Sequence, residues 1–166
     1  MCIFAYGQTG SGKTFTVQGS ASNPGITPRA IDELFTIVES MNNYNVTLKC
    51  YMVELYLDEL RDLLLPKNAA KIPLEIKESA TGMVIINGVS EVEIHSVQEA
   101  NRIFNFGLEH RMTRQTKMND SSSRSHLVFS IIIDSFNRQT KVRTVGKISL
   151  VDLAGSEKAS KTGTDK

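Results

Sequence analysis

Residues 7–14 have the composition and spacing of a phosphate-binding loop. They fit the pattern G-x-x-x-x-G-K-[ST] and are, in order, Gly7, Gln8, Thr9, Gly10, Ser11, Gly12, Lys13 and Thr14. Glycines let backbone N–H groups turn toward phosphate oxygens, and a helix beginning at Lys13 adds partial positive charge. The Lys13 ammonium can reach the β- and γ-phosphates of a nucleotide, and the Thr14 hydroxyl can bind Mg²⁺. The alternative is a glycine-rich turn before a helix. The apolar run at residues 2–6 predicts a buried strand before the loop, which favours nucleotide binding.

A serine-rich segment at residues 119–126 places several hydroxyl groups beside one arginine. Its residues are Asn119, Asp120, Ser121, Ser122, Ser123, Arg124, Ser125 and His126. Such a run can bind Mg²⁺, contact a γ-phosphate and order a water molecule. By itself it is equally consistent with a solvated loop.

A third segment, which we call the DLAGSE segment (residues 152–157), follows an apolar strand directly. Asp152 at the end of that strand can hold Mg²⁺ through water, and the Gly155 N–H group can approach a γ-phosphate. An ordinary strand-to-loop turn is the alternative. The presence of a phosphate loop in the same chain favours a functional interpretation of both this segment and the serine-rich one.

Hydrophobic patterning predicts the elements that position these segments. We expect helices from residue 13, over 27–41 with Thr27 as N-cap, and over 97–110 after a capping box that begins at Ser96. Strands are expected at residues 46–57, 73–77, 83–87, 91–95, 127–136 and 142–151. One or two helical turns are expected at residues 58–65, and a loop at residues 111–125. The pattern predicts an α/β fold that contains one antiparallel hairpin.

Composition limits the classes of partner. The 166 residues include 40% hydrophobic and 22% charged side chains with a net charge of +1, which is typical of one soluble globular domain. The net charge argues neither for nor against a polyanionic partner, and we expect no nucleic acid partner. No membrane partner is expected, because the longest apolar run, residues 127–133, is strand-sized. Cys2 and Cys50 are too few for a disulfide framework, so we interpret them as core residues in a reducing compartment.

The three segments together resemble a known family. GQTGSGKT, N-x-x-S-S-R-S-H and D-L-A-G-S-E, in this order, are similar to the P-loop, switch I and switch II of the kinesin motor domain. The resemblance covers essentially the whole chain. Myosins and GTPases share parts of these motifs, but the chain has no N-K-x-D guanine-reading motif, so ATP is favoured over GTP. Residues 52–56 and 62–67 resemble C-terminal-motor kinesins (kinesin-14-like), with the calmodulin-binding branch nearest.

The resemblance implies a P-loop NTPase fold, with a mixed sheet flanked by helices, that binds ATP and Mg²⁺. It implies that Thr14, Ser123 and Asp152 hold the metal ion, directly or through water. Asn119 would help to position the water network, and Ser122 would lie at the γ-phosphate.

The resemblance also implies how the site closes. Arg124 and Glu157 would form an ion pair. We hypothesise that a proton leaves the attacking water through Ser122 and a second water toward Glu157. His126 either matches the family's switch I histidine or is a strand-start histidine satisfied by a backbone group.

For the whole protein, the resemblance implies a microtubule-stimulated ATPase in the cytoplasm, associated with the microtubule cytoskeleton. Tubulin would be bound partly through residues 75–93, and calmodulin or homodimer contacts would lie outside this chain. Residues 1–166 are expected to be a partial motor domain, without the family's first strands, adenine-contacting segment, relay helix and main tubulin-binding elements. We therefore expect an exposed sheet edge. We also expect that the chain alone binds ATP weakly, if at all, is inactive as an ATPase and does not move on microtubules. The alternative to a partial motor domain is a compact small NTPase whose first strand is N-terminal.

Two hypotheses about function follow from the resemblance. The first is an ATP-driven microtubule motor, present here as a fragment. The second is a truncated, non-motile kinesin-like module that binds microtubules or another partner.

Overall fold

A mixed β-sheet forms the centre of the molecule. The computed structural model describes residues 1–66, 69–70, 72–115 and 124–157. Within them, a six-stranded sheet has the order β1-β8-β7-β2-β3, with β6 also paired to β2, and β4 and β5 form a separate two-stranded sheet. The strands are β1 (Cys2–Ala5), β2 (Tyr44–Tyr56), β3 (Glu59–Asp62), β4 (Glu75–Glu78), β5 (Val84–Asn87), β6 (Val92–Ile94), β7 (Ser125–Asn137) and β8 (Arg143–Asp152).

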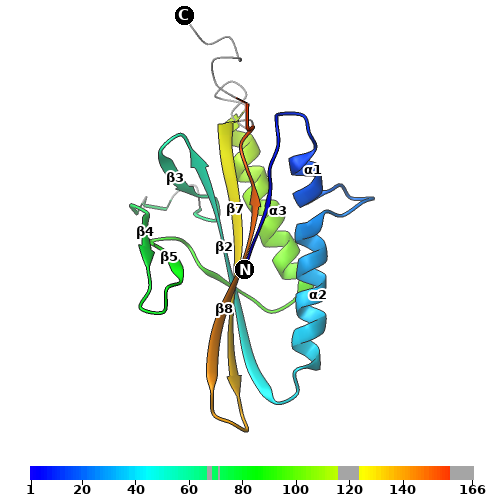
Figure 1. Ribbon diagram of the computed structural model, residues 1–166, viewed down its shortest axis with the longest axis vertical. Helices are drawn as coiled ribbons and strands as arrows, with labels where there is room; N and C mark the ends of the chain where they lie inside the picture. Colours follow the sequence, from blue (N-terminus) through cyan, green and yellow to red (C-terminus); the bar gives the residue numbers. More distant parts are fainter. Residues whose placement is uncertain (67–68, 71, 116–123, 158–166) are drawn as a thin grey trace, which may run out of the picture.

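Three helices cover one face of the large sheet, and the β4–β5 sheet lies on its other side (Figure 1). The helices are α1 (Lys13–Gln18), α2 (Ile26–Ser40) and α3 (Val97–Gln115). The core between helices and sheet includes Ile31 of α2, Phe104 of α3 and Phe129 of β7. Helix α3 approaches β2 closely at Gly107, where an added Cβ would lie 2.2 Å from Met52 Sδ. Within the described residues, no helix is both long and apolar enough to cross a membrane.

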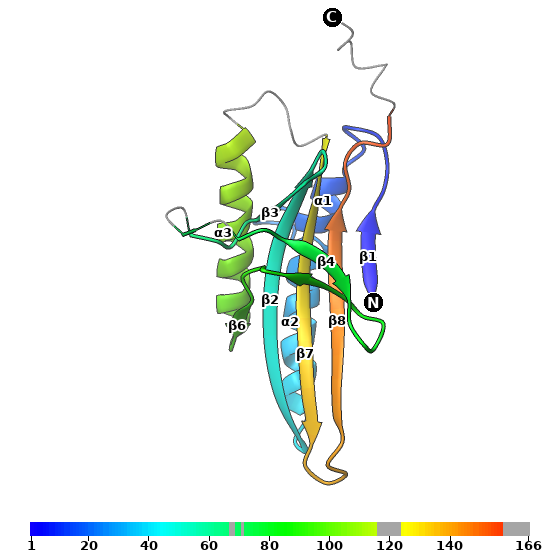
Figure 2. The same cartoon turned by 90° about the vertical axis from the view of Figure 1, so that its left-hand side faces the viewer.

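Strand register brings the candidate site residues to one end of the sheet. The long strands β2, β7 and β8 lie side by side with β1 beyond β8 (Figure 2). The antiparallel β7–β8 pair sets Leu127 opposite Asp152, so the start of β7 and the end of β8 meet. The parallel β1–β8 pair sets Ala5 beside Asp152, so the chain enters the phosphate loop at the same end.

The first strand forms as expected but is not buried. Strand β1 pairs only with β8 and is the edge of the described sheet. Cys2 is therefore exposed, and Phe4 is 61% exposed. The predictions that this strand is buried and that Cys2 is a core residue were both wrong. The expected exposed edge is present. Cys50, in the middle of β2, is fully buried as predicted.

Residues 58–65 do not form helical turns. Glu59 to Asp62 are strand β3, which pairs back onto β2 with Tyr56 opposite Glu59. Leu57, with φ of 53°, and Asp58 make the tight connection. Short apolar runs suit either a helix or a strand, and here pairing with the exposed backbone of β2 decides the outcome.

Two further boundaries differ from the sequence expectation. Strand β6, expected at residues 91–95, spans Val92–Ile94 and pairs with β2. Helix α2 begins two residues earlier than expected, because Gly25 rather than Thr27 is its N-cap.

Helix α3 has the predicted start and a different end. The Ser96 hydroxyl accepts a hydrogen bond from the Glu99 N–H group at 3.1 Å, as in a capping box, whereas the Glu99 carboxylate accepts from His95 N–H at 3.0 Å. The helix then runs to Gln115, so the first part of the expected loop at residues 111–125 is helical.

Candidate functional site

The phosphate loop joins the edge strand β1 to helix α1. Gly10 and Gly12 have φ of 81° and 90°, a backbone conformation that residues with a Cβ rarely adopt. The Lys13 ammonium lies back over the loop and donates a hydrogen bond to the Gln8 carbonyl oxygen at 2.9 Å. The strand–loop–helix arrangement predicted for this segment is therefore confirmed, and its lysine lies at the loop.

Thr14 and Asp152 meet directly beneath the loop. The Thr14 hydroxyl donates to Asp152 Oδ2 at 2.8 Å. Asp152 is only 2% exposed, and its Oδ1 atom is buried without a hydrogen-bond partner among the described residues. A buried, unpartnered carboxylate oxygen is costly, so it indicates a place for a cation or a cation-bound water.

The donor atoms at this point fit Mg²⁺. Mg²⁺ prefers hard oxygen ligands and usually keeps several waters while it binds one or two protein groups together with substrate phosphates. Thr14 and Asp152 supply a hydroxyl and a carboxylate of this kind. In the part of the chain that the structure describes, no cluster of three or more His, Cys, Asp or Glu side chains could hold a metal by itself.

A buried arginine, which the sequence reasoning missed, supports Asp152 from the side of α3. Arg111 is 5% exposed, and its guanidinium lies 3.3 Å from Glu54 Oε1 and 3.3 Å from Asp152 Oδ2. It also donates to the Ser125 hydroxyl at 3.1 Å and to the Ser125 carbonyl at 3.3 Å. In the sequence, Glu54 could have indicated this arginine. It is a charged residue at the end of a mostly apolar run in the predicted buried strand, and a buried charge requires a buried partner.

The DLAGSE segment lies against the phosphate loop. The Ser156 N–H group donates to the Gly7 carbonyl at 3.0 Å. The Glu157 carboxylate accepts two hydrogen bonds from Thr9, one from the backbone N–H at 2.9 Å and one from the hydroxyl. The hydroxyl hydrogen bond is the main cause that lowers the pKa of Glu157. The phosphate loop, the metal-binding candidates and the DLAGSE segment thus form one site.

This arrangement can be compared with known protein families. A model described as the kinesin motor domain matches residues 1–166. The chain belongs to the kinesin motor domain family. The predicted family and the predicted fold class are both confirmed.

Individual kinesins show how much of a kinesin this chain represents. It is 52% identical over 165 residues to Kinesin-like protein KIN-14E of Arabidopsis thaliana and 54% identical over 165 residues to Kinesin-like protein KIN-14I of Oryza sativa subsp. japonica. Each alignment covers 99% of this chain and 13% of the relative. A solved structure of a fast kinesin matches with a TM-score of 0.88 and 38% identity, covering 99% of this chain and 47% of that one. The KIN-14 relatives agree with the predicted kinesin-14-like class.

The structure brings together several residues of the predicted kinesin site. Lys13, Thr14, Asp152, Gly155 and Glu157 lie where the phosphate loop meets the end of β8. Asn119, Ser122 and Ser123 lie outside the described residues, so their roles stay predictions.

The expected ion pair between Arg124 and Glu157 is not present. Among the described residues, no ion pair or hydrogen bond joins them, and Glu157 is bound to Thr9 instead. Thr9 offers both its backbone N–H and its hydroxyl to the carboxylate, which engages both carboxylate oxygens.

His126 has the backbone contact that we gave as one alternative. Its Nδ1 atom accepts a hydrogen bond from the Ala154 N–H group at 3.0 Å. The histidine therefore links the end of the serine-rich segment to the DLAGSE segment.

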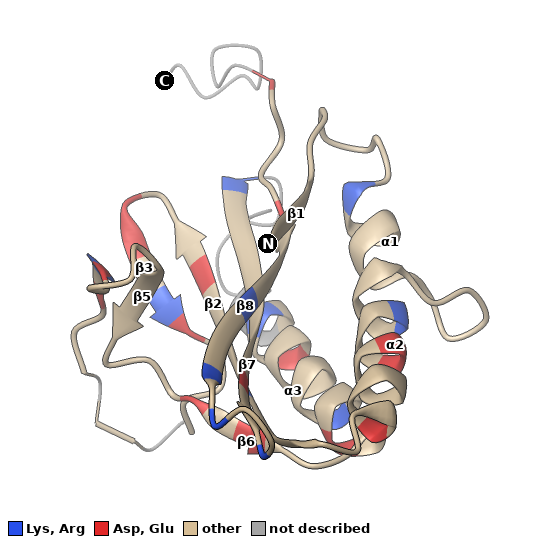
Figure 3. Ribbon diagram, turned by 60° about the horizontal axis from the view of Figure 1, so that its bottom comes forward, with Lys and Arg blue, Asp and Glu red and all other residues tan. Residues whose placement is uncertain are grey.

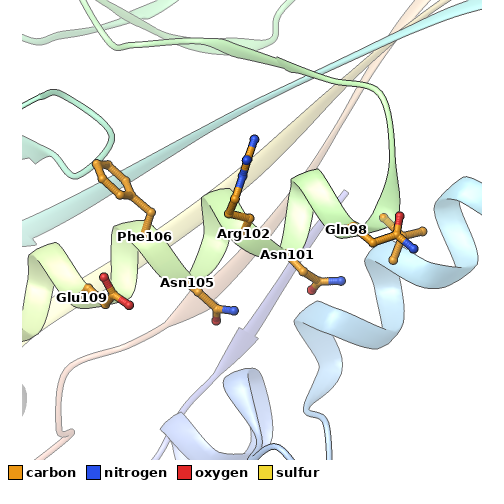
Figure 4. A pocket seen from close by; sticks show the side chains of 7 residues that line it. Gln98, Asn101, Arg102, Asn105, Phe106 and Glu109 are labelled. Atoms are coloured by element: carbon orange, nitrogen blue, oxygen red, sulfur yellow. The ribbon is translucent and has the colours of Figure 1, made fainter.

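A surface pocket along α3 is separate from this site. All of its lining residues come from that helix (Figure 4): Val97, Gln98, Asn101, Arg102, Asn105, Phe106 and Glu109. None belongs to the phosphate loop or the DLAGSE segment, so the pocket is no part of the candidate nucleotide site.

Proposed function

We propose that this chain carries the ATP-hydrolysing site of a microtubule motor. The observation that supports this most strongly is the Thr14–Asp152 pair, with its unpartnered buried carboxylate oxygen, directly beneath a phosphate loop. Membership of the kinesin motor domain family supports the same function.

The substrate phosphates would be bound mainly by the loop. Lys13 has to exchange the Gln8 carbonyl for the β- and γ-phosphates, a short movement because its ammonium already lies at the loop. Thr14, Asp152 and Ser123 would hold Mg²⁺, which supplies neutralisation of the charge that develops on the phosphates.

Hydrolysis of a phosphoanhydride needs an in-line water and electrostatic stabilisation rather than a covalent intermediate. We assign the positioning of that water and the contacts to the γ-phosphate to Ser122, Ser123 and Arg124 of the serine-rich segment and to Gly155 and Glu157 of the DLAGSE segment.

Microtubules are the proposed partner, and the microtubule cytoskeleton is the proposed location. Residues 75–93, which include the β4–β5 sheet, are the described part of the proposed tubulin contact. The sheet carries both signs of charge, with Lys77 2.7 Å from Glu75, and Figure 3 shows acidic and basic residues interspersed over the molecule. Calmodulin or a homodimer partner would be bound by regions outside this chain.

Replacement of the loop lysine tests the proposed activity. In the whole motor protein, Lys13→Ala should lower microtubule-stimulated ATP hydrolysis by about 100-fold or more, because the variant loses a preorganised cation at the developing phosphate charge. Release of inorganic phosphate is measured with and without microtubules. Lys49→Ala is the control, because Lys49 is an exposed lysine on β2 whose nearest carboxylate is 4.0 Å away.

Unchanged phosphate release by Lys13→Ala would contradict the proposal. A wild-type protein that binds microtubules but releases no phosphate would support the alternative, a non-motile binding module.

A further inference from the structure

Glu157 occupies hydrogen-bond donors that belong to the phosphate loop. Its two carboxylate oxygens accept from the backbone N–H and the hydroxyl of Thr9, the third residue of the loop. Backbone N–H groups of such loops serve to bind anionic phosphate oxygens. A carboxylate is therefore bound where the loop chemistry selects a phosphate.

The Glu157 carboxylate also lies close to Gly155. A Cβ added at Gly155 would lie 2.4 Å from both Glu157 carboxylate oxygens and 2.5 Å from the Thr9 hydroxyl oxygen. Gly155 is the residue whose N–H group we assigned to the γ-phosphate. The carboxylate therefore lies next to both Thr9 of the phosphate loop and the residue assigned to the γ-phosphate.

Charge keeps the contact in place. The hydrogen bonds from Thr9, together with the positive charge of Lys13, lower the pKa of Glu157, so the side chain is an anion at neutral pH. Two anionic groups, the carboxylate and a γ-phosphate, do not share one set of donors at low energy.

We propose that Glu157 is an internal competitor of the γ-phosphate: its carboxylate occupies the Thr9 donors of the phosphate loop until a nucleoside triphosphate displaces it. This inference rests on the proposed function, since it concerns binding of the same substrate. A nucleoside diphosphate lacks the competing group and leaves the contact closed. Because the Ser156 N–H to Gly7 hydrogen bond does not involve the carboxylate, the side chain can leave while the segment stays attached.

The test compares two ligands on four proteins. The ligands are ADP and an ATP analogue with an NH group between the β- and γ-phosphorus atoms, both with Mg²⁺. The proteins, each prepared as the whole motor protein, are the wild type, Glu157→Gln, Glu157→Asp and the control Glu39→Gln, which removes an exposed carboxylate near the end of α2. Dissociation constants are measured by calorimetry, and folding is checked by circular dichroism.

Glu157→Gln should bind the ATP analogue about tenfold more tightly than the wild type, because a charge-assisted hydrogen bond no longer has to be broken. Its dissociation constant for ADP should stay within about twofold of the wild-type value, because ADP binding does not require the hydrogen bonds of Glu157 to be broken. Glu157→Asp keeps the charge but is one methylene shorter, so it should also tighten binding of the analogue. Glu39→Gln should behave as the wild type.

Equal tightening of both ligands, or a Glu157→Asp variant that behaves as the wild type, would overturn the proposed competition. An unchanged affinity of Glu157→Gln for the ATP analogue would also overturn the proposed competition, but not the proposal that the protein binds ATP. Failure of every protein to bind either ligand would instead overturn the proposed function, and the competitor with it.

A measurement on the wild type does not depend on variants that fold. The carboxyl carbon resonance of Glu157, observed by NMR, should move when the ATP analogue is added and stay in place with ADP. The same movement with both ligands would contradict the inference.

Discussion

Arg111 brings a full positive charge into the interior, where it lies between two carboxylates. Glu54 is on β2 and Asp152 at the end of β8, and each lies 3.3 Å from the guanidinium. A buried charge is tolerated only when it is paired and its remaining donors are satisfied, and here the Ser125 hydroxyl and carbonyl satisfy them. The side chain thus links a helix to the strand end that carries the candidate metal-binding group.

Arg111→Met should lower the free energy of unfolding by about 3–5 kcal/mol, because it leaves two buried carboxylates without a counter-charge. Urea unfolding followed by circular dichroism measures the loss. Arg143→Met is the matched control: Arg143 pairs with Asp134 at the surface, where solvent screens the pair, so its loss should lower the free energy of unfolding far less than the loss of Arg111. Equal losses in the two variants would show that the buried arginine is not an energetic link.

Among the helices, α2 has a buried hydroxyl group without a hydrogen-bond partner near its N-terminal end. The helix begins at Ile26, and Thr27 in its first turn is fully buried. The Thr27 hydroxyl has no hydrogen-bond partner among the described residues. As an N-cap, the residue would have used this hydroxyl, but Gly25 has that position instead.

Thr27→Val should therefore raise the free energy of unfolding by about 1 kcal/mol, because it replaces an unpartnered buried hydroxyl by a methyl group of similar size. Thermal unfolding measures the change. In the exposed part of the same helix, Thr36→Val removes a hydroxyl that donates to the Asp32 carbonyl at 3.0 Å and should give no gain. A lower melting temperature for Thr27→Val would contradict this interpretation.

Over the whole molecule, burial differs sharply between the edge and the centre of the sheet. The two cysteines lie at these two places. Cys2 lies exposed on the edge strand β1, whereas Cys50 is buried in β2. Burial, with a smaller contribution from the charge of Glu99, raises the pKa of Cys50 to about 12. A thiolate is the reactive form of cysteine, so Cys50 should be inert in the folded protein.

We expect iodoacetamide at pH 8 to modify Cys2 in the native protein and to modify Cys50 only after unfolding in urea. Peptide mass spectrometry identifies the modified residue. Since the Cys50 pKa of about 12 lies far above the pH of the experiment, raising the pH to 9 should not make Cys50 react at a rate like that of Cys2. Rapid native modification of Cys50 would show that β2 is accessible.

The amino-acid sequence was enough to predict those features that depend on residues close together in the chain. Residues 7–14 predict a phosphate loop because glycine spacing and the strand–loop–helix context lie within one short stretch. The order of three such motifs was enough to indicate the family. Only the tertiary structure decided which strand lies at the edge, that residues 59–62 pair with β2, and that Arg111 and Glu54 meet inside the core. The contact between Thr9 and Glu157, 148 residues apart, belongs to the same group, because the pairing of β1 with β8 is what places them together.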